Sequence, residues 1–163
     1  MRKAFLTISL IAASVVAMQS CKKNKTDTDA DNALYSEITG SGYSYYQSGN
    51  ILPGVSPSPH GSFKLRFNAT AVSALDSTGE LPTGNNFPTG SIIVKEVYDG
   101  SNISLYAVMK KDPSNGNAGS GWVWAEFHPD GSAAFSTGKK GDGCISCHNG
   151  SPNRDLTRTF DLH

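Results

Sequence analysis

Two cysteines and a histidine near the C-terminus form the part of the chain with the clearest chemistry. They occur as Cys144-Ile145-Ser146-Cys147-His148. Two thiols separated by two residues and followed directly by histidine are the attachment signature of a c-type haem. Each thiol can form a thioether with one vinyl group of the porphyrin, and the imidazole of His148 can then bind the iron. The motif therefore predicts one covalent haem c, held by Cys144, Cys147 and His148.

Paired cysteines have other uses, and three of them stay open at this point. A redox dithiol usually follows the first strand of a βαβ unit, whereas this pair follows a stretch rich in glycine and lysine. A structural zinc ion needs four ligands, and the other candidates are the scattered His60, His128 and His163. A simple disulfide beside a chance histidine is the last alternative. We favour haem c over all three.

The N-terminus carries the pattern of an export signal. Arg2 and Lys3 precede an apolar segment, residues 4–16, which is too short to span a bilayer. The segment that ends at Cys21 resembles a bacterial lipoprotein signal, although Met18 stands where a leucine is usual. In that class the cysteine becomes the lipid-bearing first residue. We expect residues 1–20 to be a signal peptide and Cys21 to be lipidated, with a plain secreted protein as the alternative.

The cysteine count fits this interpretation. The chain has three cysteines, so one can carry lipid and two can carry haem. Covalent haem attachment in bacteria takes place outside the cytoplasmic membrane, and an exported chain meets that requirement. We therefore expect an exported lipoprotein, anchored in the membrane on the periplasmic side.

Length and composition predict one domain that follows a short linker. Removal of the signal leaves 163 − 20 = 143 residues, enough for one domain with a core, which we place at residues 34–163. Residues 21–33 are almost entirely polar and are predicted to be a flexible tether. Without Arg2 and Lys3, 12 basic residues face 14 acidic ones, which argues against a nucleic-acid partner.

Alternating and turn-flanked patterns predict a mainly β (α+β) fold. The cleanest strand is 62–68, in which Phe63, Leu65 and Phe67 share one face while Lys64 and Arg66 point outward. Further segments read as a hairpin of 91–98 and 102–110, strands at 122–128 and 133–136, and a short helix at 69–75. We expect a single antiparallel-sheet domain with one or two short helices. The haem motif is expected to start a helical turn after residue 143.

A longer series of residues carries a family resemblance. The series runs His60-Gly61, Asn68, Ala71, Phe87-Pro88-x-Gly90-Ser91-Ile92-Ile93-Val94-Lys95-Glu96, Met109-Lys110-Lys111, Gly121-Trp122-x-Trp124-Ala125-x-Phe127-x-x-Asp130-Gly131 and the haem motif. Over residues 58–150 the chain resembles the cytochrome P-460 family. The resemblance implies an exported β-sheet protein with one haem c. Well-known members oxidise hydroxylamine at a haem cross-linked to a lysine, while related β-sheet cytochromes bind small gases.

The sixth coordination position of the iron separates three hypotheses. An open position would bind a small molecule such as hydroxylamine or nitric oxide; a filled one would make an electron-transfer cytochrome that serves redox partner proteins. The third hypothesis is a non-haem lipoprotein with a zinc-binding or disulfide Cys-x-x-Cys. Candidates for a filled position are Met109, His60, His128 and His163, each of which has a plain structural explanation. The lack of a dominant candidate favours an open site.

Charged residues inside apolar strands are the candidates for chemistry beside the haem. Lys95 is our candidate for the porphyrin cross-link or a hydrogen-bond donor, and Lys64 and Lys111 compete with it. Glu96 or Glu126 could accept a proton if either reached the substrate. Each of these charges could equally point to solvent from a half-buried strand. Trp122 and Trp124, two residues apart, are expected to line one apolar face, against either the haem or the core.

Overall fold

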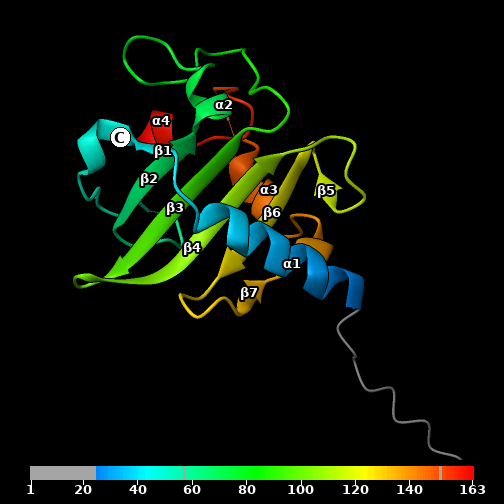
Figure 1. Ribbon diagram of the computed structural model, residues 1–163. Coiled ribbons are helices and arrows are strands. Elements are labelled where there is room, and N and C mark those ends of the chain that lie inside the picture. Colours follow the sequence, from blue (N-terminus) through cyan, green and yellow to red (C-terminus); the bar gives the residue numbers. More distant parts are fainter. Residues whose placement is uncertain (1–24, 57, 151) are drawn as a thin grey trace, which may run out of the picture.

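A computed structural model describes residues 25–163, except residues 57 and 151 (Figure 1). Seven strands form one antiparallel sheet in the order β1-β2-β3-β4-β6-β5, with β7 also paired to β6. The strands are β1 Tyr43–Tyr45, β2 Phe63–Asn68, β3 Ile92–Asp99, β4 Asn102–Lys111, β5 Ala118–Gly119, β6 Trp122–Phe127 and β7 Ala133–Phe135. The predicted mainly β, antiparallel fold is confirmed.

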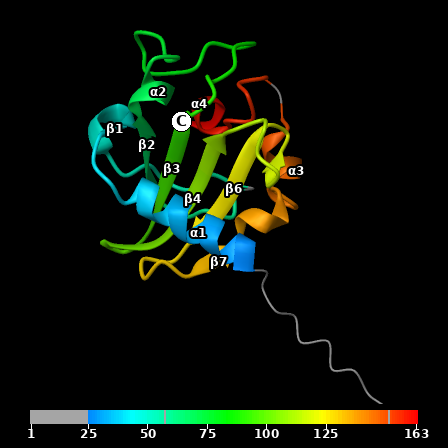
Figure 2. The same cartoon turned by 45° about the vertical axis from the view of Figure 1, so that its right-hand side comes forward.

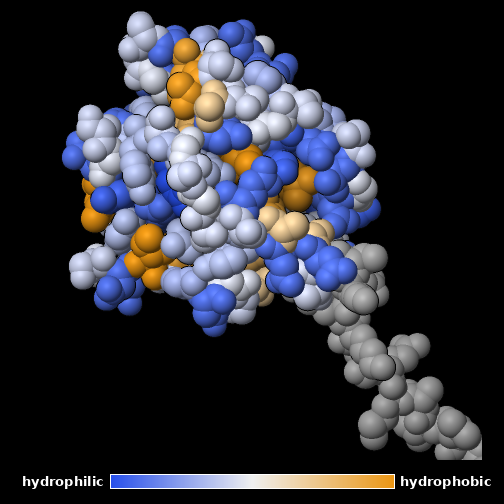
Figure 3. Space-filling model, in the orientation of Figure 1, coloured by the Kyte–Doolittle hydropathy of each residue, from blue (hydrophilic) through white to orange (hydrophobic). Residues whose placement is uncertain are grey.

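Helices lie on both sides of this sheet. They are α1 Lys25–Ile38, α2 Ala69–Val72, α3 Cys144–His148 and α4 Thr159–Leu162, with short 3-10 turns at Tyr46–Gly49 and Thr137–Lys139. Figures 1 and 2 show α1 crossing the face formed by β3, β4 and β6, while α3 and α4 lie behind the sheet. In Figure 3 the side covered by α1 presents small, separate hydrophobic patches among mostly hydrophilic residues. None of the helices in the described part of the chain is long and apolar enough to cross a membrane.

The helix α1 corrects the predicted tether. We expected residues 21–33 to be flexible, but the helix begins at Lys25 and packs on the sheet. Leu34 and Ile38, four residues apart on one helical face, are buried in a cluster with residues of β3, β4 and β6. The buried carboxylate of Asp31 accepts hydrogen bonds of 2.8 Å from the backbone N–H and the hydroxyl of Thr137. Residues 21–24 and the predicted signal lie outside the described residues.

Turns and caps follow the local predictions. Asp99 pairs with Asn102 across the β3–β4 hairpin, which leaves a two-residue loop whose Gly100 has a φ of 59°. The side chain of Asn68 accepts a 2.9 Å hydrogen bond from the N–H of Ala71 and so caps α2. That helix ends at Val72 and is therefore three residues shorter than the predicted helix at 69–75.

The outward face of β2 is more buried than its sequence suggests. Arg66 was predicted to point outward, and it does lie on the face opposite Phe63 and Phe67, yet it is only 7% exposed. Its Nε lies 2.6 Å from a carboxylate oxygen of Glu96, and its guanidinium lies 4.5 Å from the ring centroid of Tyr43. The short strand β1 supplies that ring and covers the ion pair, which explains the burial.

Candidate functional site

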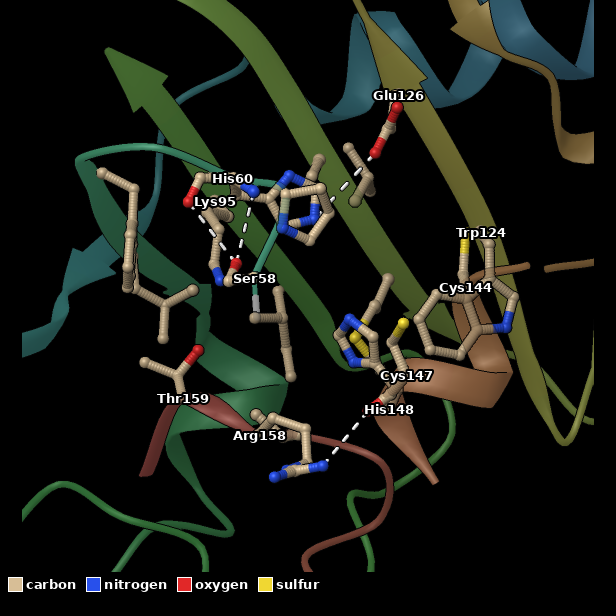
Figure 4. Close-up of a pocket in the computed structure, with 18 of the residues that line it drawn as sticks. Ser58, His60, Lys95, Trp124, Glu126, Cys144, Cys147, His148, Arg158 and Thr159 are labelled. Atoms are coloured by element: carbon tan, nitrogen blue, oxygen red, sulfur yellow. Dashed lines mark hydrogen bonds and ion pairs between the residues drawn. The ribbon is translucent and has the colours of Figure 1, made fainter. Parts of the chain in front are cut away.

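A cavity of about 390 Å³ lies on the face of the sheet opposite α1 (Figure 4). Its walls come from β2, β3, β4 and β6, from the loop before β2, and from α3 and the C-terminal segment. Apolar side chains dominate these walls, and they include Phe63, Leu65, Ile93, Met109, Trp124 and Phe135. A concave, mostly apolar cavity with a few polar groups is the usual form of a cofactor site.

The Cys-x-x-Cys-His motif forms one wall of the cavity. Cys144, Cys147 and His148 all lie in α3 and all line the cavity, and the predicted helical turn after residue 143 is confirmed. Gly141 and Gly143 adopt φ of 74° and 84°, and a Cβ at Gly141 would stand 2.5 Å from Cδ1 of Trp124. Glycine therefore lets the chain turn closely against the sheet before α3 begins.

One nitrogen of the His148 ring is held by the backbone. Nδ1 lies 2.7 Å from the carbonyl oxygen of Leu156, and since a carbonyl can only accept, Nδ1 carries the proton. Nε2 is therefore the nitrogen with a free lone pair, as a metal ligand requires. The ring also packs edge-on against Trp124, with 5.0 Å between centroids. Burial lowers the pKa of His148, which favours this neutral form.

The two thiols of the motif are free. Burial and the nearby carboxylate of Glu126 raise the pKa of Cys144 to about 11, so this thiol is protonated at neutral pH. Among residues 25–163 without 57 and 151, no group of three His, Cys, Asp or Glu side chains is placed to hold a metal ion.

A row of paired residues runs across the cavity wall. Lys95 of β3 pairs with Ala107 of β4, which pairs with Glu126 of β6. The small Ala107 leaves space between the two charged side chains, and all three line the cavity. Burial lowers the pKa of Lys95 to about 8 and raises the pKa of Glu126. Lys95 and Glu126 therefore face the cavity rather than open solvent.

His60 also lines the cavity, from the loop that precedes β2. Its side chain is 14% exposed, and its Nε2 lies 4.0 Å from Oε1 of Glu126. Burial lowers the pKa of His60 to about 4, and the positive charge of Lys95 contributes. His60 is thus a neutral imidazole beside a carboxyl group, on the part of the cavity away from α3 (Figure 4).

Other predicted residues do not reach the cavity. Glu96, our second candidate for catalysis, points to the opposite face, because neighbouring residues of a strand alternate in direction. There it pairs with Arg66 and accepts long hydrogen bonds from the hydroxyls of Tyr45 and Tyr98. The proposed role of Glu96 at the cofactor is therefore corrected.

Two of the three candidate lysines also interact away from the cavity. Lys64 lies over the rings of Tyr45 and Tyr98, and Lys111 forms a 2.6 Å ion pair with Asp155. Among the three lysines, only Lys95 lines the cavity.

The two tryptophans have different surroundings: Trp122 is buried in the core, whereas Trp124 lines the cavity. His128 is exposed, whereas Met109 and His163 line the cavity. The carbonyl of Leu156 was not foreseen, because a backbone acceptor carries no sequence signal.

The structure thus combines a single antiparallel sheet, an apolar cavity and a Cys-x-x-Cys-His helix that lines it. The model of the Cytochrome P460 family matches residues 44–159. The chain belongs to the cytochrome P460 family, which confirms the resemblance seen in the sequence, and its cofactor is accordingly a haem. No curated protein matches the chain significantly.

The described residues fit a haem. Two thiols three residues apart in α3, a histidine with Nε2 free, and predominantly apolar walls are the donor set and surroundings that a porphyrin requires. Two basic side chains at the cavity also suit a haem. Lys95 and Arg158 line it and can pair with the carboxylates that haem carries.

Proposed function

We propose that this chain is a mono-haem c-type cytochrome that binds or redox-converts a small nitrogenous molecule, hydroxylamine or nitric oxide, at the iron. Cys144 and Cys147 would hold the haem covalently, and His148 would bind its iron. The observation that carries the proposal is that the motif and three polar side chains line one apolar cavity. Those side chains are His60, on the part of the cavity away from α3, and Lys95 and Glu126, which flank Ala107 across neighbouring strands (Figure 4).

The bound haem would supply the redox-active iron, and the protein would supply position and protons. The Leu156 carbonyl fixes the orientation of the His148 ring. Lys95 is the candidate for a hydrogen-bond donor to the bound molecule or for a cross-link to the porphyrin. Glu126, whose pKa is raised by burial, is the candidate proton acceptor.

Electron transfer with a filled sixth position is the second candidate function. It is favoured by the placement of His60 and Met109, which line the cavity and carry donor atoms known as axial ligands. The neutral state of His60 would suit it as a ligand.

The optical spectrum of the ferrous protein separates the two functions. We expect a high-spin ferrous haem that takes up carbon monoxide and nitric oxide. A six-coordinate low-spin ferrous form that does not bind carbon monoxide would instead support electron transfer. His60→Ala and Met109→Leu would then show which side chain fills the position.

The same spectrum tests the proposed role of Lys95. A far-red-shifted ferrous Soret band in the wild type would indicate a lysine cross-link, and Lys95→Arg should then remove it. Lys64→Arg is the matched control, because Lys64 lies on the other face of β2. A shifted band that survives Lys95→Arg would exclude Lys95 as the cross-linked residue.

Export and lipid anchoring form the last part of the proposal. They are supported by the charged and apolar N-terminal segment that precedes Cys21 and by the need to attach haem outside the cytoplasm. An anchored domain on the periplasmic side would keep the haem close to redox partners at the membrane.

A further inference from the structure

The backbone that holds His148 adopts an unfavourable conformation. The N–H of Thr157 donates a 2.9 Å hydrogen bond to the carbonyl of Arg154, which closes a four-residue turn. Its two central residues, Asp155 and Leu156, have φ of 51° and 67°. Two positive values are the pattern of a type I′ turn, which normally uses Asn-Gly or Gly-Gly. A leucine in this region needs support from surrounding contacts.

The carboxylate of Asp155 provides that support. Oδ1 accepts hydrogen bonds from Nζ of Lys111 at 2.6 Å and from Nε1 of Trp122 at 3.3 Å. Oδ2 accepts a 2.9 Å hydrogen bond from the backbone N–H of Phe87. Asp155 is 6% exposed, and a buried carboxylate is stable only where such donors meet it. Three separate segments therefore fix the position of this side chain.

Asp155 and the ligand histidine are connected through one residue. Asp155 immediately precedes Leu156, whose carbonyl accepts the Nδ1–H of His148 at 2.7 Å. We infer that Asp155 is a positioning residue, which holds the turn so that the Leu156 carbonyl orients the His148 ring and strengthens Nε2 as a ligand. The inference rests on the proposed function, because Nε2 must bind iron for the ligand strength to matter. A donated Nδ1–H raises the basicity of a ligand histidine.

A matched pair of variants isolates this role. Asp155→Asn removes the charge while keeping the shape of the side chain. Glu96→Gln is the control, because Glu96 also forms a buried 2.6 Å ion pair, but on the opposite face of the sheet. Both variants should lower stability. Only the first should affect His148.

The readouts on the full-length haem protein are the Fe–His stretching frequency and the reduction potential of the iron. Asp155→Asn is expected to lower the frequency and raise the potential, while Glu96→Gln keeps both at wild-type values. Wild-type values in a folded Asp155→Asn protein would overturn the inference. If that variant does not fold, Trp122→Phe removes one donor to Asp155 and should shift both readouts in the same direction by a smaller amount; no shift there overturns the inference equally.

Failure of the proposed function would be recognised separately. If the wild-type chain carries no covalent haem, the proposed function is wrong, and nitrogen-15 resonances of His148 in the same full-length chain then test the positioning role. Wild-type His148 should be protonated at Nδ1, and Asp155→Asn should give a mixture of the two tautomers. An unchanged Nδ1–H tautomer would contradict the role of Asp155.

Discussion

The charge states of the side chains around the cavity follow from their burial. His60 has a pKa lowered to about 4, while burial lowers that of Lys95 to about 8 and raises that of Glu126. His60 is thus neutral at pH 7. An imidazole that stays neutral can bind iron.

Acid should weaken the folded protein through His60. Its folded pKa, about 4, lies below the usual value of 6.5, so the unfolded chain binds more protons between these values. Stability is therefore intact above pH 6.5 and falls as the pH approaches 4, by roughly 3 kcal/mol for this group. In His60→Gln the fall between pH 6.5 and 4 should shrink by about that amount, as measured by denaturant unfolding.

The control for this prediction is His128→Gln. His128 is exposed beside the turn before β7, so its replacement should leave the wild-type acid response unchanged. If His60→Gln and the wild type lose stability in parallel, burial of a neutral His60 is not the cause.

At the level of elements, α1 is part of the domain rather than a linker. Ile38 is fully buried against the sheet, so Ile38→Ala should cost about 2–5 kcal/mol of unfolding free energy. Val72→Ala, at a position that is 38% exposed, should cost less than about 0.5 kcal/mol. Equal and small losses in thermal or urea unfolding would show that α1 does not pack as described.

The strands could be predicted because their patterns are local. Alternation in 62–68 and the Asp-Gly turn between β3 and β4 each need only neighbouring residues. The helix α1 could not, since its few apolar residues suggest a solvated segment and its docking depends on distant partners such as Thr137.

The sequence also predicted part of the candidate site. The motif points to Cys144, Cys147 and His148 without help from the fold, and all three line the cavity. Strand phase also shows that Lys95 and Glu96 point in opposite directions. It does not show which face carries the cavity, because α3 and the C-terminal segment decide that.

For the whole molecule, the anchor and the haem should be separable. If Cys21 carries the proposed lipid, Cys21→Ser should move the protein from the membrane to the soluble fraction, because lipid chains on that residue would provide the membrane affinity. Covalent haem should be retained, as seen by haem staining of both fractions. Cys144→Ser, which keeps the predicted lipid site, should stay with the membrane. Membrane association that persists in Cys21→Ser would contradict the anchor.

The central claim is that this β domain carries a porphyrin bonded to α3. It is tested most directly by haem staining and intact mass of the denatured protein, produced with haem attachment active. The wild type should retain haem after denaturation and solvent extraction, while a Cys144→Ser, Cys147→Ser double variant should lose it. A wild-type polypeptide with no retained haem and two free thiols would contradict the claim.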